Sequence, residues 1–149
     1  MPPIRVGDPA PDVTLTTADG ATIRLGDLRG RSAVVLFFYP KDGTPVCTQE
    51  ACAFRDSYEK FRTAGAEVIG VSADSDERHR AFAARHGLPF PLVADTDGSV
   101  RKAFGAPSIL GVVPGRTTYV IDREGIVRTV FTANFVSAAH VQKALAALG

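Results

Sequence analysis

The feature that most constrains the fold is a continuous apolar run from Ala33 to Phe38, which ends just before Pro40. A strand that is covered on both faces loses the usual alternation of apolar and polar residues. The segment Glu67–Ser72 is expected to be a second central strand. We therefore expect an α/β fold in which other layers pack against both faces of a central sheet.

Turn and capping residues divide the remaining chain into short elements. Asp19-Gly20 predicts a hairpin between residues 13–17 and 22–25, and a second hairpin is expected from residues 117–121 and 126–131. Glycines and capping serines predict further elements, which are helices at 45–64, 76–86 and 97–104, a helix from Ser137 onward, and a strand at 90–94. This order predicts a mixed β-sheet flanked by helices, and without a recognisable linker we expect one domain over residues 1–149.

Charge and hydropathy exclude several classes of function. The net charge is +1 and the basic residues are scattered, so nucleic-acid binding is not expected. The longest apolar stretch, residues 33–39, is too short to cross a membrane. The N-terminal residues lack the pattern of a secretory signal, which leads us to expect a cytoplasmic, reducing location. There, paired cysteines are more often catalytic than structural.

The chain has two cysteines, Cys47 and Cys52, and both fall within the predicted helix 45–64. A disulfide between them would close a very short loop and would stabilise the fold little. Cys47 lies at the start of the helix face that carries aromatic residues such as Phe54, where unpaired N–H groups and the helix dipole favour an anion such as a thiolate. The alternative is that both cysteines are small buried apolar residues.

The geometry of an ideal helix also bears on the two thiols. Residues five apart have Cα atoms separated by roughly 8–9 Å, which exceeds the usual limit of about 7 Å for a disulfide. A bond between Cys47 and Cys52 would therefore require the first turns of the helix to unwind. We hypothesise two states, with the helix intact when the thiols are reduced and locally melted when they are oxidised.

The segment Phe37–Asp56 contains the motif Pro-x-x-x-Thr-x-x-Cys, followed by the second cysteine after four intervening residues. Together with residues 6–11 and 116–122, it resembles the peroxiredoxin family, and most of all the peroxiredoxin Q group, also called bacterioferritin comigratory proteins. The resemblance implies a thioredoxin-like fold and thiol-dependent reduction of hydrogen peroxide or organic hydroperoxides. The chain departs from the family in two unusually apolar segments, 106–115 and 132–136, which bear on substrate preference and oligomeric state.

The resemblance also implies roles for individual residues. Cys47 matches the peroxidatic cysteine and Cys52 the resolving cysteine, while Thr44, Arg116 and Pro40 match the other active-site positions. Arg116 would hold the thiolate and bind the peroxide oxygens, since its guanidinium is a permanent cation with several donors. The Thr44 hydroxyl would accept a hydrogen bond from the peroxide. Pro40 would shield the thiolate from water.

Two further residues are candidates for substrate binding. Glu50 fits two roles equally well, either to orient an arginine such as Arg116 or to act as an ordinary carboxylate at a helix start. Tyr39 is expected to form a wall of the pocket. We expect no cofactor, and His79, His86 and His140 are too scattered in the sequence to suggest a metal site. The expected partners are a peroxide and a thioredoxin-type reductant (a glutaredoxin is the alternative), and the chain is expected to be a monomer.

Three other functions compete with the peroxidase. A thioredoxin-like disulfide reductase normally has two residues between its cysteines, whereas this chain has four. A peroxide sensor or redox-switched interaction protein could use the same cysteine pair, and turnover with a reductant would distinguish it from an enzyme. A non-catalytic module with the same fold is disfavoured by the combination of Pro40, Thr44, Cys47 and Arg116.

Overall fold

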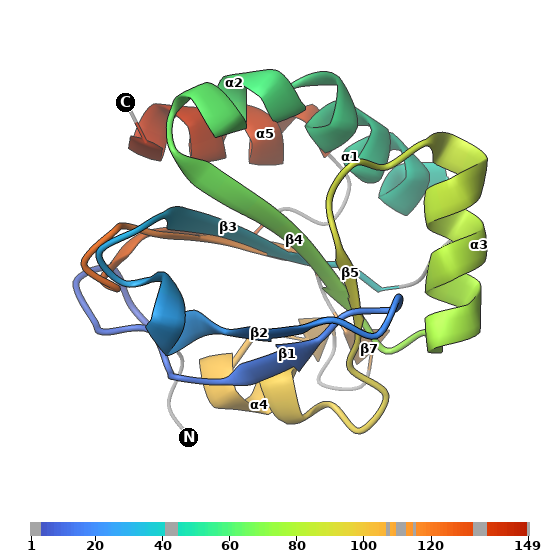
Figure 1. Cartoon of the computed structure of the whole chain (residues 1–149), viewed down its shortest axis with the longest axis horizontal. Coiled ribbons are helices and arrows are strands. Elements are labelled where there is room, and N and C mark those ends of the chain that lie inside the picture. The colour runs from blue at the N-terminus through green and yellow to red at the C-terminus, as the bar shows by residue number, and fades with distance from the viewer. Residues whose placement is uncertain are drawn as a thin grey trace.

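A five-stranded mixed sheet forms the centre of the computed structural model (Figure 1). The structure describes residues 4–40, 45–106, 108–109, 113–114, 116–132 and 137–148. In spatial order the strands are β5 (Leu92–Ala94), β4 (Ala66–Ser72), β3 (Ala33–Phe38), β8 (Thr117–Ile121) and β9 (Val127–Thr132). The first three are parallel to one another, and β8 and β9 run antiparallel to their neighbours. All residues of β3 are buried, as its unbroken apolar sequence requires.

Helices cover one face of this sheet, and a smaller layer covers the other. Alternate β3 residues divide between the layers, because Val35 and Phe37 pack with the first and Leu36 and Phe38 with the second. The first layer contains α1 (Pro45–Asp56), α2 (Tyr58–Thr63), α3 (Asp76–His86) and α5 (Ser137–Leu148). The second contains β1 (Thr14–Thr16), β2 (Thr22–Arg24), the 3₁₀ helix η1 (Leu25–Leu28) and α4 (Ser99–Phe104) (Figure 1).

The predicted helix 45–64 is wrong in one respect, because it is divided into α1 and α2 at Ser57. Ser57 has φ −103° and ψ 7°, outside regular helical geometry. In a straight helix, residues seven apart are separated by about 10 Å along the axis. The turn instead brings the rings of Phe54 and Phe61 to a centroid distance of 5.6 Å, with both rings fully buried. Burial of both aromatic side chains thus outweighs continuation of the helix.

Helix α3 has the ends that its sequence predicts. The Ser75 hydroxyl accepts a hydrogen bond from the backbone N–H of Arg78 at 3.2 Å. Gly87 follows the helix with φ 60°, a left-handed conformation that glycine adopts without a steric penalty. These two ends fix where the helix begins and stops, and so help to determine which of its side chains face the interior. As a result His79 is fully buried, and His86, its last residue, lies near α1.

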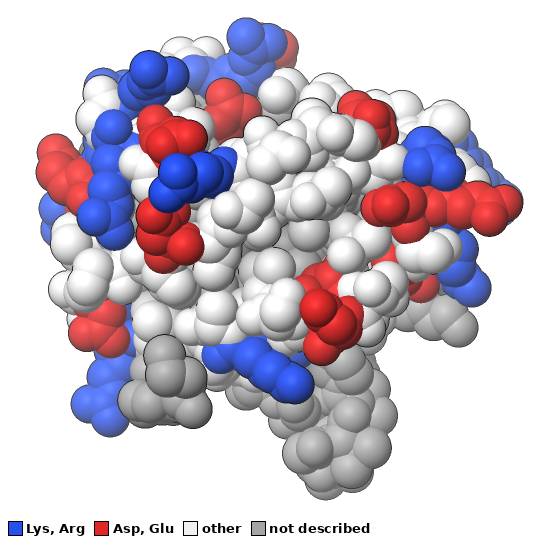
Figure 2. All heavy atoms as spheres, turned by 60° about the horizontal axis from the view of Figure 1, so that its bottom comes forward, with Lys and Arg blue, Asp and Glu red and all other residues white. Residues whose placement is uncertain are grey.

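Half of the apolar segment 106–115 lies outside the described residues; the described half consists of Ala106 and a short antiparallel pair formed by β6 (Ser108–Ile109) and β7 (Val113–Pro114). Of the segment 132–136, only Thr132 is described. Within the described part of the chain, no helix is long and apolar enough to span a membrane. Figure 2 shows basic and acidic side chains interspersed around an uncharged centre on one face, so neither sign of charge dominates that face.

Candidate active site

Cys47 lies in the first turn of α1, on the side that faces the sheet. Its side chain is 2% exposed and belongs to the same buried cluster as Ala51 and Phe54, which confirms the predicted helix face. Tyr39, the residue after β3, belongs to the same cluster. The thiol is therefore held at the boundary between the helix start and the end of the central strand.

Arg116 reaches this thiol from the neighbouring strand. It immediately precedes β8, whose first residue, Thr117, is paired with Phe38 at the end of β3. This register places Arg116 beside the C-terminal end of β3, on the side of the sheet where α1 begins. Its Nη2 donates a hydrogen bond to the Sγ of Cys47 at 2.7 Å, and the arginine is 2% exposed. A buried permanent cation is therefore in direct contact with the sulfur.

Glu50 holds the other side of the guanidinium. The Nε of Arg116 donates a hydrogen bond to Oε1 of Glu50 at 3.1 Å, and both side chains are almost completely buried. The geometry therefore favours the first of the two roles considered for Glu50, the orientation of Arg116. Burial raises the pKa of Glu50 to about 8, although the charge of Arg116 acts in the opposite direction and lowers it.

His140 is a member of this cluster that sequence reasoning missed. Its Nδ1 lies 2.7 Å from the hydroxyl of Thr118 on β8 and 3.4 Å from Oε2 of Glu50. Oε2 has no hydrogen-bond partner among the described residues, and the imidazole lies beside it. The signal was present in the sequence, because His140 precedes Ala144 by four residues and therefore lies on the apolar face of α5.

The other cysteine has different surroundings. Cys52 is half-buried on the side of α1 that faces α3, where its Sγ lies 3.9 Å from Nδ1 of His86. Arg55, one turn further along α1 than Cys52, donates from Nη1 to the backbone carbonyl of His86 at 2.7 Å. Both cysteines are free thiols in this structure. The structure therefore represents the reduced state, with the helix between Cys47 and Cys52 intact.

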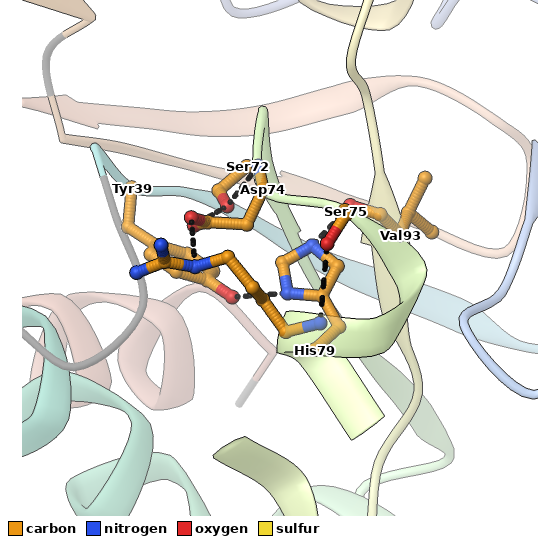
Figure 3. A network of polar contacts seen from close by, with 7 residues as sticks. Tyr39, Ser72, Asp74, Ser75, His79 and Val93 are labelled. Atoms are coloured by element: carbon orange, nitrogen blue, oxygen red, sulfur yellow. Dashed lines mark hydrogen bonds and ion pairs between the residues drawn. The ribbon is translucent and has the colours of Figure 1, made fainter. Parts of the chain in front are cut away.

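Tyr39 and His79 form a buried pair behind the start of α1 (Figure 3). The Nε2 of His79 lies 2.9 Å from the carbonyl oxygen of Val93, which can only accept a hydrogen bond. Nε2 therefore carries the proton, and in the neutral imidazole Nδ1 accepts from the hydroxyl of Tyr39 at 3.4 Å. Pro40 is half-buried directly after Tyr39. Thr44, the other predicted site residue of this loop, lies outside the described residues.

A second polar group in Figure 3 fixes the start of α3 next to this pair. The hydroxyl of Ser72, at the end of β4, donates to Oδ2 of Asp74 at 2.6 Å and accepts from the Asp74 backbone N–H at 3.2 Å. The other oxygen of Asp74 lies 3.2 Å from Nε of Arg78 on α3. These contacts tie the helix that carries His79 to the end of the neighbouring strand, and so support the position of Tyr39.

Comparison with known proteins places this geometry in a family. Residues 6–130 match the model of the AhpC/TSA family. The chain is 48% identical over 140 residues to a chloroplastic peroxiredoxin Q of Sedum lineare, and the match covers 93% of this chain and 75% of that protein. A chloroplastic peroxiredoxin Q of Triticum aestivum is also 48% identical, and there the match covers 93% of this chain and 64% of the relative.

Solved structures give the same result for the fold. The peroxidoxin BcpB of Mycobacterium tuberculosis is 38% identical with a TM-score of 0.88, and the match covers 97% of this chain and 96% of that one. Peroxiredoxin Q of Xanthomonas campestris is 32% identical with a TM-score of 0.85, covering 97% and 94%. These likenesses confirm the thioredoxin-like fold that the resemblance implied. The chain belongs to the AhpC/TSA family and, within it, is a peroxiredoxin of the Q group.

Proposed function

We propose that this chain is a thiol peroxidase that reduces hydrogen peroxide and organic hydroperoxides, first forming a sulfenic acid on Cys47 and then a Cys47–Cys52 disulfide. The observation that carries the proposal is the contact between Arg116 Nη2 and Cys47 Sγ, at 2.7 Å in a buried setting. The Xanthomonas campestris bacterioferritin comigratory protein, 32% identical with a TM-score of 0.84, is described as having alkyl peroxide reduction activity. That similarity supports organic hydroperoxides as a substrate class.

In the first step the Cys47 thiolate attacks one oxygen of the peroxide. An S–O bond forms while the O–O bond breaks, and the second oxygen leaves as hydroxide or alkoxide and takes up a proton. Negative charge therefore moves from sulfur onto oxygen in the transition state. Arg116 adjoins the sulfur, so its positive charge stabilises the charge that moves onto those oxygens, and its hydrogen bond to Glu50 keeps the guanidinium in place. We assign Thr44 to peroxide binding and Pro40 to shielding the thiolate.

In the second step Cys52 attacks the sulfenic sulfur, a disulfide forms and water leaves. The two thiols have separate neighbours in the reduced structure, Arg116 for one and His86 for the other. Part of α1 must therefore unwind before the sulfurs meet. A thioredoxin-type dithiol would then restore both thiols by exchange. This cycle uses only thiols and the peroxide, and needs no cofactor.

The proposal extends to the setting in which the enzyme works. We propose one domain over residues 1–149, because the two buried clusters share a single central sheet. We also propose a monomer in a reducing compartment such as the cytoplasm. Several relatives have names that place them in the chloroplast, so the family is not confined to the cytoplasm.

Intact mass provides the test. Reduced protein receives one equivalent of hydrogen peroxide, and the mass is followed over time for wild type and for Cys52→Ser. The disulfide removes two hydrogens, so wild type should lose about two mass units, whereas the variant should gain about sixteen as its sulfenic acid persists. If wild type reacts no faster than free cysteine, the peroxidase proposal fails. A rapid reaction that no thioredoxin-type reductant can reverse would favour a sensor instead.

A further inference from the structure

We propose that His86 is the base that takes the proton from Cys52 in the folded helix, before this thiol leaves its position to attack the oxidised Cys47. The inference rests on the proposed function, since it assumes that Cys52 is the resolving cysteine. A thiol must lose its proton before it can act as a nucleophile. The Nδ1 of His86 lies 3.9 Å from the Sγ of Cys52, within the range of a hydrogen bond to sulfur.

Two contacts hold His86 in this position from different sides. Arg55 Nη1 donates to the backbone carbonyl of His86 at 2.7 Å, which fixes the end of α3 against α1. The Phe82 ring lies edge-on to the imidazole with a centroid distance of 4.9 Å. Because both the backbone and the ring of His86 are held, the orientation of Nδ1 toward Cys52 follows from the packing of α1 on α3.

Charged side chains of both helices surround this pair. Arg55 lies on α1 beside Cys52 and is bonded through Nε to Asp56 at 3.0 Å. The hydrogen bond that Arg55 donates to Asp56 raises the pKa of Arg55, and the nearby Cys52 contributes in the same direction. On α3, Arg78 and Arg85 line the adjoining groove with His86. Arg55 and Arg78 are each paired with a carboxylate, that of Asp56 and that of Asp74, which offsets their charge beside the thiol and the imidazole.

A groove between the two helices gives the imidazole access to solvent. It has a volume of about 550 Å³, and it is lined by Pro45, Thr48, Gln49, Arg78, Ala81, Phe82, Arg85 and His86. A proton accepted by His86 can therefore pass to water. The same opening admits a small molecule such as free imidazole, which makes chemical rescue of a truncated side chain feasible.

The step balances without any additional reactant. The proton of Cys52 moves to Nδ1 of His86, and the thiolate attacks the sulfur of the Cys47 sulfenic acid. The S–S bond forms as the S–O bond breaks, and the departing hydroxide takes up one proton to become water. His86 returns its proton to solvent, so that the imidazole is neutral again. Overall, a sulfenic acid and a thiol yield a disulfide and water.

The test separates the two steps in a single turnover. Wild type, His86→Ala and Arg85→Gln are reduced, mixed with one equivalent of hydrogen peroxide, quenched over time and weighed. At pH 7 about 3% of an ordinary thiol is ionised, so loss of the base can slow disulfide formation by at most about thirtyfold. We expect His86→Ala to slow this step about tenfold. Formation of the sulfenic acid should be unchanged, and Arg85→Gln should behave as wild type.

Two further measurements distinguish proton transfer from packing. The defect of His86→Ala should shrink at pH 9.5, where a thiol ionises without help, and added imidazole should restore the rate at pH 7. His86→Gln, which retains more of the side-chain volume, should show the same defect if the variant's fold is intact by thermal melting. A defect that is equal at both pH values and is not rescued by imidazole would overturn the inference.

Other results for the rate of disulfide formation would also contradict the proposal. Disulfide formation at the wild-type rate in His86→Ala would overturn the role of His86. Faster formation would also overturn it, because the contact with Cys52 would then hold the helix closed. A wild-type protein that forms sulfenic acid but never loses two mass units would contradict the resolving role of Cys52. That result would refute the proposed disulfide mechanism, whereas the preceding results concern His86 alone.

Discussion

Cys47 and Cys52 belong to one helix, yet their surroundings differ in almost every respect. Cys47 is buried, and its sulfur is bonded to Arg116, which is itself held by Glu50. Cys52 is half-buried in the contact between α1 and α3, beside an imidazole that lines the groove between these helices. The first setting encloses the thiol beside a buried positive charge, whereas the second leaves the thiol partly exposed.

The difference corresponds to the two proposed tasks. A thiol that attacks peroxide benefits from donors that are already in place when charge develops on oxygen. A thiol that must leave its position to reach a partner benefits from weak, reversible contacts. One helix meets both requirements, because its inner side faces the sheet and its other side faces α3.

The strongest test of this comparison is removal of the cation beside Cys47. Arg116→Met should reduce the rate of reaction with hydrogen peroxide by about 10²–10³-fold, the usual cost of losing one preorganised donor to developing charge. Peroxide consumption by reduced enzyme in a stopped-flow instrument measures this rate. Arg55→Met removes the corresponding cation beside Cys52, and should leave the peroxide step unchanged to within about twofold. Similar losses in both variants would remove the distinction between the two thiols.

The buried carboxyl behind Cys47 predicts a pH-dependent stability. The pKa of Glu50 is raised from 4.5 to about 8 in the folded protein, so between these values the folded state keeps a proton that the unfolded state has lost. Stability should therefore fall as the pH rises through this window, by an amount on the order of a few kcal/mol. Glu50→Gln should flatten the profile, as measured by urea unfolding from pH 5 to pH 9.

The matched control for this carboxyl is Asp56→Asn, which changes an exposed acid near Cys52. Its stability profile should remain parallel to that of wild type, because an exposed carboxyl has the same solvent in both states. If Glu50→Gln also remains parallel to wild type, the carboxyl behind Cys47 titrates normally and the proposed asymmetry of the two regions loses one of its supports.

A smaller effect on the peroxide reaction is expected from His140, which also belongs to the surroundings of Cys47. His140→Asn should lower the rate of the peroxide reaction by about tenfold, because Glu50 loses a polar neighbour of Oε2 and holds Arg116 less firmly. His86→Asn should leave this step unchanged and slow only disulfide formation. Rapid-quench mass measurements on both variants separate the steps. If His140→Asn slowed disulfide formation and His86→Asn slowed the peroxide reaction, the roles given to the two histidines would be wrong.

The smallest expected effect concerns Tyr39. Its hydroxyl is bonded to His79 in the interior, so Tyr39→Phe should lower the free energy of unfolding by about 1 kcal/mol and change the peroxide rate by less than about twofold. Chemical unfolding and stopped-flow kinetics test the two parts. A large loss of rate with little loss of stability would instead support the direct role in substrate binding that the sequence suggested for Tyr39.

Local patterns were sufficient to predict much of the fold. The apolar run of β3, the capping serine of α3 and the glycine after it depend on neighbouring residues, and the structure confirms all three. The break at Ser57 was missed because it results from packing between Phe54 and Phe61. Helix propensities describe single residues and contain no information on such a contact.

Contacts between distant segments were harder to predict. The sequence named Glu50 and Arg116 but could not decide whether they meet, since that depends on the register between β3 and β8. His86 and Cys52 are 34 residues apart in the sequence, and they come close only because α1 and α3 pack against each other. The spacing of apolar residues shows which face of a helix is buried, but it does not show which other helix that face will contact.

The register of Arg116 also has a consequence for the newly made chain. The cation is 69 residues away from Cys47 in sequence, and it arrives only when β8 joins the antiparallel side of the sheet. His140 comes later still, with the final helix. During synthesis from the N-terminus, the thiol is therefore made before the cation that contacts it in the folded protein. If the proposed role of Arg116 holds, the full reactivity of Cys47 toward oxidants is reached only after these later segments have folded.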